Sequence, residues 1–162
     1  MAADRLHGDS GSSACGWSKR GQDDEKLGRS RGGFSTKVHV AVDALGNPVR
    51  LVLSEGQVAD ITGAAWLIEG LEFDALIADK GYDADWLRHV VITEHDAEPV
   101  IPPRGNRKAA IDDDKHLYKI RNLVERFIGW AKHFRRVATR YEKTARNFLS
   151  FWSFAAVIKL LK

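Results

Sequence analysis

Residues 37–42 alternate between valine and polar or small residues, which is the two-residue period of a half-buried β-strand. Residues 49–53 form a second apolar run of strand length. Between the two, residues 43–48 include glycine, asparagine and proline, which are typical of turns. The pattern therefore predicts an antiparallel hairpin, with His39 on its outward, solvent-facing side.

The middle of the chain alternates helical periods with short apolar runs. A continuous apolar run of four residues is typical of a buried strand, whereas a spacing of three or four residues indicates a helix. In chain order we expect a helix over 60–68 with Asp60 as N-cap, a strand over 75–78, a helix that begins at Asp83 or Asp85, and a strand over 99–101.

Two long helices are predicted near the end of the chain, over residues 117–134 and 145–161, after a polar linker at 104–114. The apolar stretch 148–161 is shorter than the roughly 20 residues that span a bilayer, so it predicts a core helix and no membrane partner. The element order β-β-α-β-α-β-α-α is typical of a mixed α/β layered domain. The first helix carries an apolar stripe that must face the core, made of Ile120, Val124, Phe127, Ala131 and Phe134.

Residues 1–33 are rich in glycine, serine and charge and lack an apolar period. They predict a disordered or loop-rich arm, followed by one domain over 34–162. The chain of 162 residues has a single cysteine, Cys15, which excludes an internal disulfide. No signal-peptide pattern is present, so the expected compartment is the cytoplasm.

The net charge of +3 conceals a strong asymmetry. Residues 55–98 carry eleven acidic and two basic side chains, whereas residues 104–146 carry thirteen basic and five acidic ones. A basic block of this density can contact nucleic-acid phosphates. Charge alone equally fits two solvated faces that neutralise each other, so both interpretations stay open.

Two patterns could carry chemistry. Asp79 follows the buried run 75–78 and precedes Gly81, the place where α/β sheets present reactive groups. A plain turn at the strand end explains the same residues. On the helix over 117–134, Tyr118, Arg121, Glu125 and Lys132 share a second face, which could hold a metal ion beside phosphates or could be an ordinary solvated face with an Arg121–Glu125 pair.

The spacing Tyr118-x2-Arg121-x3-Glu125-x6-Lys132 resembles the signature of DDE transposases from bacterial insertion sequences. Residues 28–39, 78–83 and 137–141 look like the same family, so the resemblance covers residues 22–162. It implies an RNase H-like fold, in which a mixed sheet is flanked by helices. It also implies transposition: DNA binding, metal-dependent phosphodiester cleavage and strand transfer, carried out by a homo-oligomer on DNA.

In this family Asp79 and Glu125 would be the second and third carboxylates of a metal-binding triad. Their oxygens suit Mg²⁺, or Mn²⁺ in vitro, and a pair of such ions activates the attacking oxygen and stabilises the leaving one. The residues expected to contact DNA are Lys80, Tyr118, Arg121, Lys132, Arg135, Arg136 and Arg140.

The first carboxylate of the triad should end a strand upstream of residue 28. Residues 1–21 contain no apolar run, and the acids available there are Asp4 and Asp9. We therefore expect an N-terminally truncated chain with a missing or degenerate first strand, inactive if that ligand is lost. Two alternatives stay open: a non-catalytic fragment that binds DNA or associates with subunits, and a metal-dependent nuclease of related fold.

Overall fold

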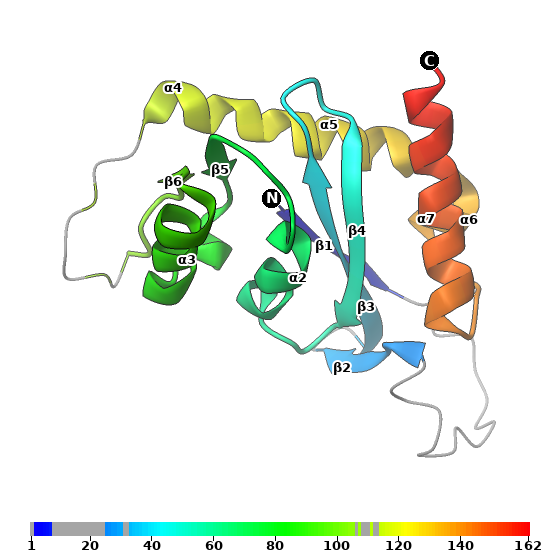
Figure 1. Cartoon of the computed structure of the whole chain (residues 1–162). Helices are drawn as coiled ribbons and strands as arrows, with labels where there is room; N and C mark the ends of the chain where they lie inside the picture. Colours follow the sequence, from blue (N-terminus) through cyan, green and yellow to red (C-terminus); the bar gives the residue numbers. More distant parts are fainter. Residues whose placement is uncertain (1, 8–24, 31–32, 106, 108–110, 112–113) are drawn as a thin grey trace.

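The computed structural model describes residues 2–7, 25–30, 33–105, 107, 111 and 114–162 (Figure 1). The strands are β1 (Ala2–His7), β2 (Gly28–Ser30), β3 (Gly33–Val42), β4 (Pro48–Glu55), β5 (Ala75–Ile77) and β6 (Glu98–Val100). The helices and 3₁₀ turns are η2 (Asp60–Gly63), α2 (Ala64–Ile68), η3 (Lys80–Tyr82), α3 (Asp85–His95), α4 (Lys115–Tyr118), η4 (Lys119–Arg121), α5 (Asn122–Ala131), α6 (Arg135–Ala138) and α7 (Ala145–Leu160).

Strand β3 is the centre of a four-stranded antiparallel sheet. It pairs with β1 on one edge, and on the other edge with β2 and β4. The predicted hairpin is confirmed, since β3 and β4 pair from Thr36–Glu55 to Val42–Pro48. Its turn is held by Asp43, whose Oδ1 accepts from the backbone N–H groups of Leu45 and Asn47.

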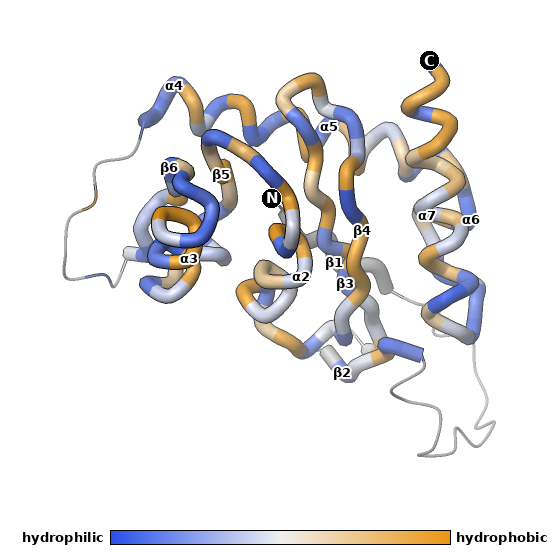
Figure 2. Tube along the Cα trace, in the orientation of Figure 1, coloured by the Kyte–Doolittle hydropathy of each residue, from blue (hydrophilic) through white to orange (hydrophobic). Residues whose placement is uncertain are grey.

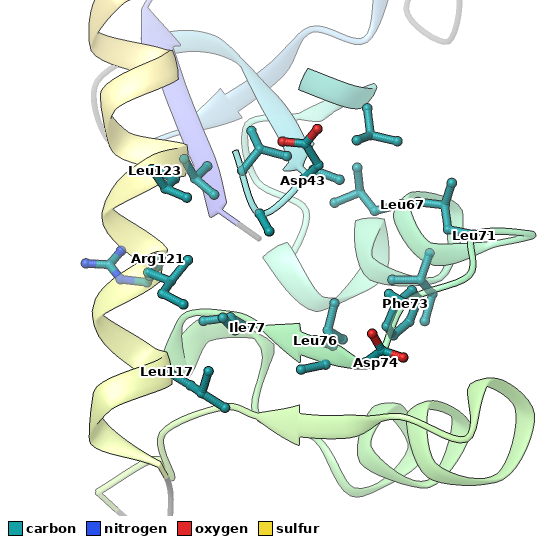
Figure 3. A pocket seen from close by; sticks show the side chains of 18 of the residues that line it. Asp43, Leu67, Leu71, Phe73, Asp74, Leu76, Ile77, Leu117, Arg121 and Leu123 are labelled. Atoms are coloured by element: carbon teal, nitrogen blue, oxygen red, sulfur yellow. The ribbon is translucent and has the colours of Figure 1, made fainter. Parts of the chain in front are cut away.

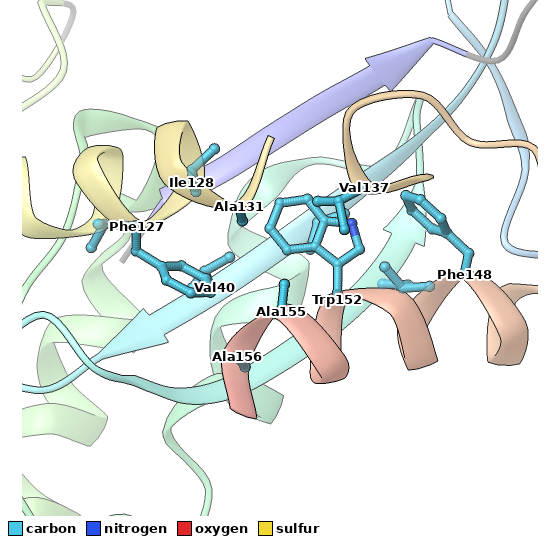
Figure 4. Packing of buried hydrophobic residues seen from close by; sticks show 12 residues of the cluster. Val40, Phe127, Ile128, Ala131, Val137, Phe148, Trp152, Ala155 and Ala156 are labelled. Atoms are coloured by element: carbon cyan, nitrogen blue, oxygen red, sulfur yellow. The ribbon is translucent and has the colours of Figure 1, made fainter. Parts of the chain in front are cut away.

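One face of this sheet is covered by α5 and α7 (Figures 1 and 4). The side chain of Trp152 is fully buried at the centre of this layer, and its ring lies 6.4 Å from that of Phe127, centroid to centroid. The predicted helical period is confirmed at its central positions, which all face the sheet. The buried members of this cluster are Val38, Val40, Leu53, Val124, Phe127, Ile128, Ala131, Val137, Phe148, Trp152, Ala155 and Ala156.

A second unit packs on the opposite face of the main sheet. There β5 and β6 form a separate two-stranded parallel sheet next to α3, with α2 between this pair and β3–β4 (Figure 1). A second apolar cluster fills this layer and includes Leu67, Leu87 and Val91, while Ala41 and Val52 of the main sheet pack against it. The main sheet is therefore covered on both faces.

Coverage of both faces makes the prediction of an outward-facing His39 wrong. Its side chain is fully buried beneath η2 and η3. Its Nδ1 lies 3.1 Å from the Tyr82 hydroxyl and its Nε2 lies 2.7 Å from Ser54 Oγ, so both ring nitrogens have partners. A Cβ on Gly63 would come within 3.0 Å of the ring, so only glycine allows this approach.

The chain before Gly28 also differs from the sequence-based expectation. Residues 2–7 form β1, whose register with β3 runs from Ala2–Val40 to His7–Ser35. The expectation that no strand precedes Gly28 is therefore wrong for these residues. Pairing at a sheet edge is made by backbone groups and needs no apolar run, so the side-chain pattern did not reveal it. The expected loop-rich arm over 1–33 is also wrong near its end, where Gly28–Ser30 form β2 and β3 begins at Gly33. Residues 8–24 of that arm lie outside the described residues.

Two predicted helices are divided in the structure. The segment 60–68 begins as the 3₁₀ turn η2 with Ala59 at the N-cap, because Asp60 accepts instead from the Lys37 ammonium at 2.6 Å. The segment 117–134 contains the 3₁₀ turn η4 and ends its α-helix at Ala131. A 3₁₀ turn has about 3.0 residues per turn, whereas an α-helix has about 3.6. The side chain of Ile120 is therefore rotated away from the apolar stripe, and it is 40% exposed.

Helix α3 begins one residue away from either predicted cap. Its N-cap is Ala84, while Asp85 lies in the first turn and Asp83 accepts from an arginine side chain instead.

At the carboxyl end of the chain, the last turns of α7 are apolar in Figure 2. Phe154 and Val157 are exposed there, as is Leu161, which follows the helix. None of the helices in the described part of the chain has both the length and the apolar character needed to cross a membrane.

The buried His39 should make stability depend on pH. Burial is the largest cause that lowers its pKa, to about 4; the Asp60 charge opposes this and the Lys37 charge adds to it. Between pH 6.5 and 4 the unfolded chain binds a proton that the folded chain rejects, so stability falls as the pH falls. Urea unfolding at pH 7 and pH 5 should show a loss of about 2 kcal/mol from this residue.

The control is a His39→Gln variant, which cannot titrate at this position. Its unfolding free energy should lack this part of the pH dependence, even though its stability at pH 7 is lower. An NMR titration of the His39 imidazole gives an independent measurement. Equal pH dependence in both proteins, or a His39 ring that becomes protonated near pH 6.5, contradicts the prediction.

Candidate active site

Asp79 lies where the small parallel sheet ends and the chain turns away. Ala78 still bonds to this sheet, through its N–H to the Val100 carbonyl, and Asp79 then caps η3. One carboxylate oxygen, Oδ1, accepts from the backbone N–H of Lys80 at 2.8 Å. The turn-forming interpretation of this residue is therefore correct. Asp79 is half-buried, so part of the residue stays in contact with solvent.

Across from this turn, the segment α4–η4–α5 presents three of the predicted site residues. The Tyr118 hydroxyl lies 3.4 Å from Asp79 Oδ1. The Arg121 guanidinium lies over the Tyr118 ring at 5.6 Å from its centroid, and it forms an ion pair with Glu125 at 2.7 Å. The structure therefore brings Asp79, Tyr118, Arg121 and Glu125 together in one continuous row of contacts.

The pKa of Tyr118 reflects its burial and the charges around it. Burial is the largest cause that raises the pKa of Tyr118 above its ordinary value. The Arg121 charge opposes this rise, while the negative charges of Asp79 and Glu125 add to it. The hydroxyl therefore keeps its proton and can donate it to Asp79 in a hydrogen bond.

The turn that carries Asp79 is anchored on its other side by a buried ion cluster. Asp83 is 1% exposed and accepts from Arg88 Nε at 3.1 Å and from Arg107 Nη1 at 2.8 Å. Its second oxygen accepts from the backbone N–H of Arg104 at 2.9 Å. Burial alone would raise the pKa of Asp83, but these hydrogen bonds outweigh it and hold the pKa below its usual range.

The remaining basic candidates differ in how they are used. Lys80 is exposed at the start of η3, and Lys132 is half-buried at the end of α5. Arg135 donates to the Tyr141 hydroxyl at 3.0 Å, and Arg136 pairs with Glu142 at 2.6 Å while staying 60% exposed. Lys132, Arg135 and Arg136 follow Glu125 in the chain, at the end of α5 and the start of α6.

Arg140 does not fit the expected DNA contact. It is 6% exposed and donates to the carbonyls of Glu25, Glu142 and Lys143, and to Thr36 Oγ1. These contacts tie the segment before α7 to β3. Since its guanidinium donors are used in these contacts, Arg140 stabilises the fold and is not available to bind a phosphate.

The donor chemistry of Asp79 and Glu125 fits a hard divalent cation, because carboxylate oxygens are the ligands that Mg²⁺ and Mn²⁺ prefer. Glu125 is 51% exposed, so a hydrated ion can approach it. Within the described residues, no group of three or more His, Cys, Asp or Glu side chains could hold a metal ion. Asp9 lies outside the described residues, and Asp4 is described only by its strand position.

A separate cavity of about 460 Å³ lies between the end of β3, α2, β5 and the helix α4–α5 (Figure 3). Its lining is mostly apolar and includes Leu67, Leu76 and Leu117. Arg121 belongs to the lining, but its guanidinium points away from the cavity in Figure 3. The cavity therefore lies behind the row of site residues and carries none of their chemistry.

Sequence reasoning missed the residues that hold the Asp79 turn in place. His39, Ser54 and Tyr82 meet from three separate segments, and Asp83 meets Arg104 and Arg107 across a loop. The sequence offered one signal, the opposite charges of Asp83 and Arg88, but their spacing is not one that places two side chains next to each other on a helix. None of the other contacts has a local spacing rule.

The chain is similar to one protein family and to two known proteins. The family described as "Transposase DDE domain" matches residues 4–160. A Brucella ovis protein named as a transposase for insertion sequence element IS6501 is 36% identical over 130 residues, which are 80% of this chain and 100% of that protein. A Burkholderia cepacia protein named as a transposase for IS402 is 33% identical over 122 residues, 68% of this chain and 55% of that protein. No solved structure matches the chain.

Proposed function

Because the chain belongs to the transposase DDE domain family and is an insertion-sequence transposase by its relatives, we propose that it binds DNA and breaks and joins phosphodiester bonds with divalent metal ions. The observation that carries the proposal is the row of contacts from Asp79 through Tyr118 and Arg121 to Glu125. An RNase H-like fold is part of the same proposal, although the expected single mixed sheet is divided here into the antiparallel sheet around β3 and the separate parallel pair β5–β6.

Asp79 and Glu125 would hold the metal, preferably Mg²⁺ or Mn²⁺, which when bound activates an attacking oxygen and stabilises the leaving one. Each carboxylate has a neighbour that orients it. Tyr118 donates to Asp79, and Arg121 pairs with Glu125. A carboxylate that is already oriented loses less conformational freedom when it binds a ligand, so these two neighbours favour binding.

Contacts to the DNA backbone are proposed for Lys80, Lys132, Arg135 and Arg136, with Tyr118 and Arg121 closer to the reacting phosphate. The exposed Lys80, Arg135 and Arg136 and the half-buried Lys132 can neutralise phosphates without reading sequence. We also propose that the protein acts as a homo-oligomer on DNA. The exposed apolar residues Phe154, Val157 and Leu161 at the end of α7 support self-association.

For the first carboxylate of the triad we propose Asp4 in preference to Asp9. Asp4 belongs to β1, opposite Val38 of β3, and β1 lies next to the helix α5 that carries Glu125. A strand holds a ligand more rigidly than a loop does, which suits a metal site. Measuring Mn²⁺ affinity of Asp4→Asn beside Asp9→Asn distinguishes the two.

A non-catalytic role in DNA binding or subunit association is the second candidate. It is favoured by one observation, the lack of a cluster of three metal ligands among the described residues. In that case the basic residues along α5 and α6 act alone, and the chain binds DNA without binding a metal ion. The two experiments below separate these functions.

Substitution of either carboxylate should weaken metal binding. Calorimetric titration with Mn²⁺ should give binding for the unchanged chain, and affinity at least about tenfold weaker for Asp79→Asn and for Glu125→Gln, since each loses a charged ligand. Glu94→Gln, which changes an exposed acid on α3, is the matched control and should bind as the unchanged chain does. Equal binding by all four proteins rejects the metal site.

Substitution of Lys132 should weaken DNA binding in a salt-dependent way. If its ammonium contacts a phosphate, Lys132→Ala should lower the slope of log affinity against log salt by about one contact. Lys132→Arg keeps the charge and should keep the slope. Fluorescence anisotropy with labelled duplex DNA at several salt concentrations measures both. A slope that does not change in Lys132→Ala excludes a phosphate contact.

A further inference from the structure

The segment that follows β6 folds back onto the turn that carries Asp79. Arg104 lies in this segment, 24 residues after Lys80 along the chain. Its Nε donates to the Lys80 carbonyl at 3.2 Å, and its Nη2 donates to the Gly81 carbonyl at 2.7 Å. One guanidinium therefore bridges two consecutive carbonyls of the turn, a two-point contact that a planar fork of donors makes well.

The main chain of Arg104 is fixed at the same place. Its N–H donates to Asp83 Oδ2, and the buried Asp83 is itself held by Arg88. The guanidinium therefore extends from a base that cannot shift easily, because moving it would break a hydrogen bond to Oδ2 of the buried Asp83 carboxylate.

These contacts act on the 3₁₀ turn η3 that Asp79 caps. The Lys80 carbonyl also accepts from the Asp83 N–H at 3.2 Å, and the Asp79 carbonyl accepts from the Tyr82 N–H at 2.8 Å. Asp79 Oδ1 accepts from the Lys80 N–H, so the carboxylate is bonded to the same turn. Because the turn and the carboxylate are linked in this way, a clamp on the carbonyls of residues 80 and 81 limits how far the carboxylate can move.

We propose that Arg104 is a positioning residue, which holds the Asp79 carboxylate toward Tyr118 and Glu125 by clamping the carbonyls of Lys80 and Gly81. The inference rests on the proposed metal site and adds a residue to it. Arg104 binds backbone carbonyls of the turn, so it acts on the Asp79 carboxylate through the backbone.

Loss of positioning and loss of positive charge predict opposite changes in Mn²⁺ affinity when Arg104 is replaced. A positive charge near a cation site repels the cation, so loss of the Arg104 charge would by itself tighten Mn²⁺ binding. Loss of the clamp lets the Asp79 turn move and weakens binding. The exposed side chain contributes little to the core, so its replacement should leave the unfolding temperature nearly unchanged.

The test compares Arg104→Lys, which keeps the charge but offers a single donor group, with Arg104→Gln, which removes the charge and the fork. Calorimetric titration with Mn²⁺ should show affinity about tenfold weaker in both, the lower end of the effect of losing an outer-shell contact. Lys119→Gln removes an exposed positive charge from η4 without touching the clamp, and should bind Mn²⁺ as tightly or more tightly. Affinity in both Arg104 variants that equals or exceeds that of the unchanged chain overturns the proposal.

Hydrogen exchange provides a readout that needs no metal. In Arg104→Lys the amides of Tyr82 and Asp83, which close η3, should exchange about fivefold faster, because the local opening becomes easier. Amides in β3 and β4 should keep their rates. If the unchanged chain binds no Mn²⁺, the proposed function fails, and the exchange rates still decide whether the clamp exists. Unchanged exchange at Tyr82 and Asp83 overturns the inference by itself.

Discussion

The candidate site depends on holding two separately packed units together. Asp79 belongs to the small parallel sheet β5–β6, whereas Glu125 belongs to α5, which packs on the main sheet. The two units are joined by the buried bond between Tyr82 and His39 on one side. They are joined again by Tyr118, whose hydroxyl reaches Asp79 from the segment that leads into α5. A buried hydrogen bond is costly to leave unmade, so the Tyr82–His39 bond fixes where the Asp79 turn lies on the main sheet.

The same region contains most of the buried charge that the structure describes, and each charge has a partner. Lys37 pairs with Asp60 beneath the turn, and Asp83 pairs with Arg88 behind it. Buried ion pairs of this kind add little net stability, but breaking one is expensive, which makes the local geometry unique. This suits the function proposed for the turn, which is to present the Asp79 carboxylate in a defined direction.

The chain pattern predicted the local elements well and their environment less well. The hairpin and the buried positions Val124, Phe127 and Ala131 follow from spacing alone, because strand and helix periods decide which side chains share a face. The prediction failed at β1, which pairs through backbone groups, and at His39, whose face is covered by the distant η2–α2 segment. A single strand's pattern cannot show that a second layer covers its polar face.

The local sequence pattern was enough to predict which kinds of side chain form the candidate site. It placed an acid after an apolar run, and a tyrosine, an arginine and a second acid on one helix face. These follow from bond geometry within a few residues. Three contacts could not be predicted from local patterns. The Tyr118 hydroxyl contacts Asp79, and Arg140 is buried in the fold. Arg104 binds the carbonyls of Lys80 and Gly81. Such contacts join residues far apart in the chain, and they depend on how the layers pack, which no local period specifies.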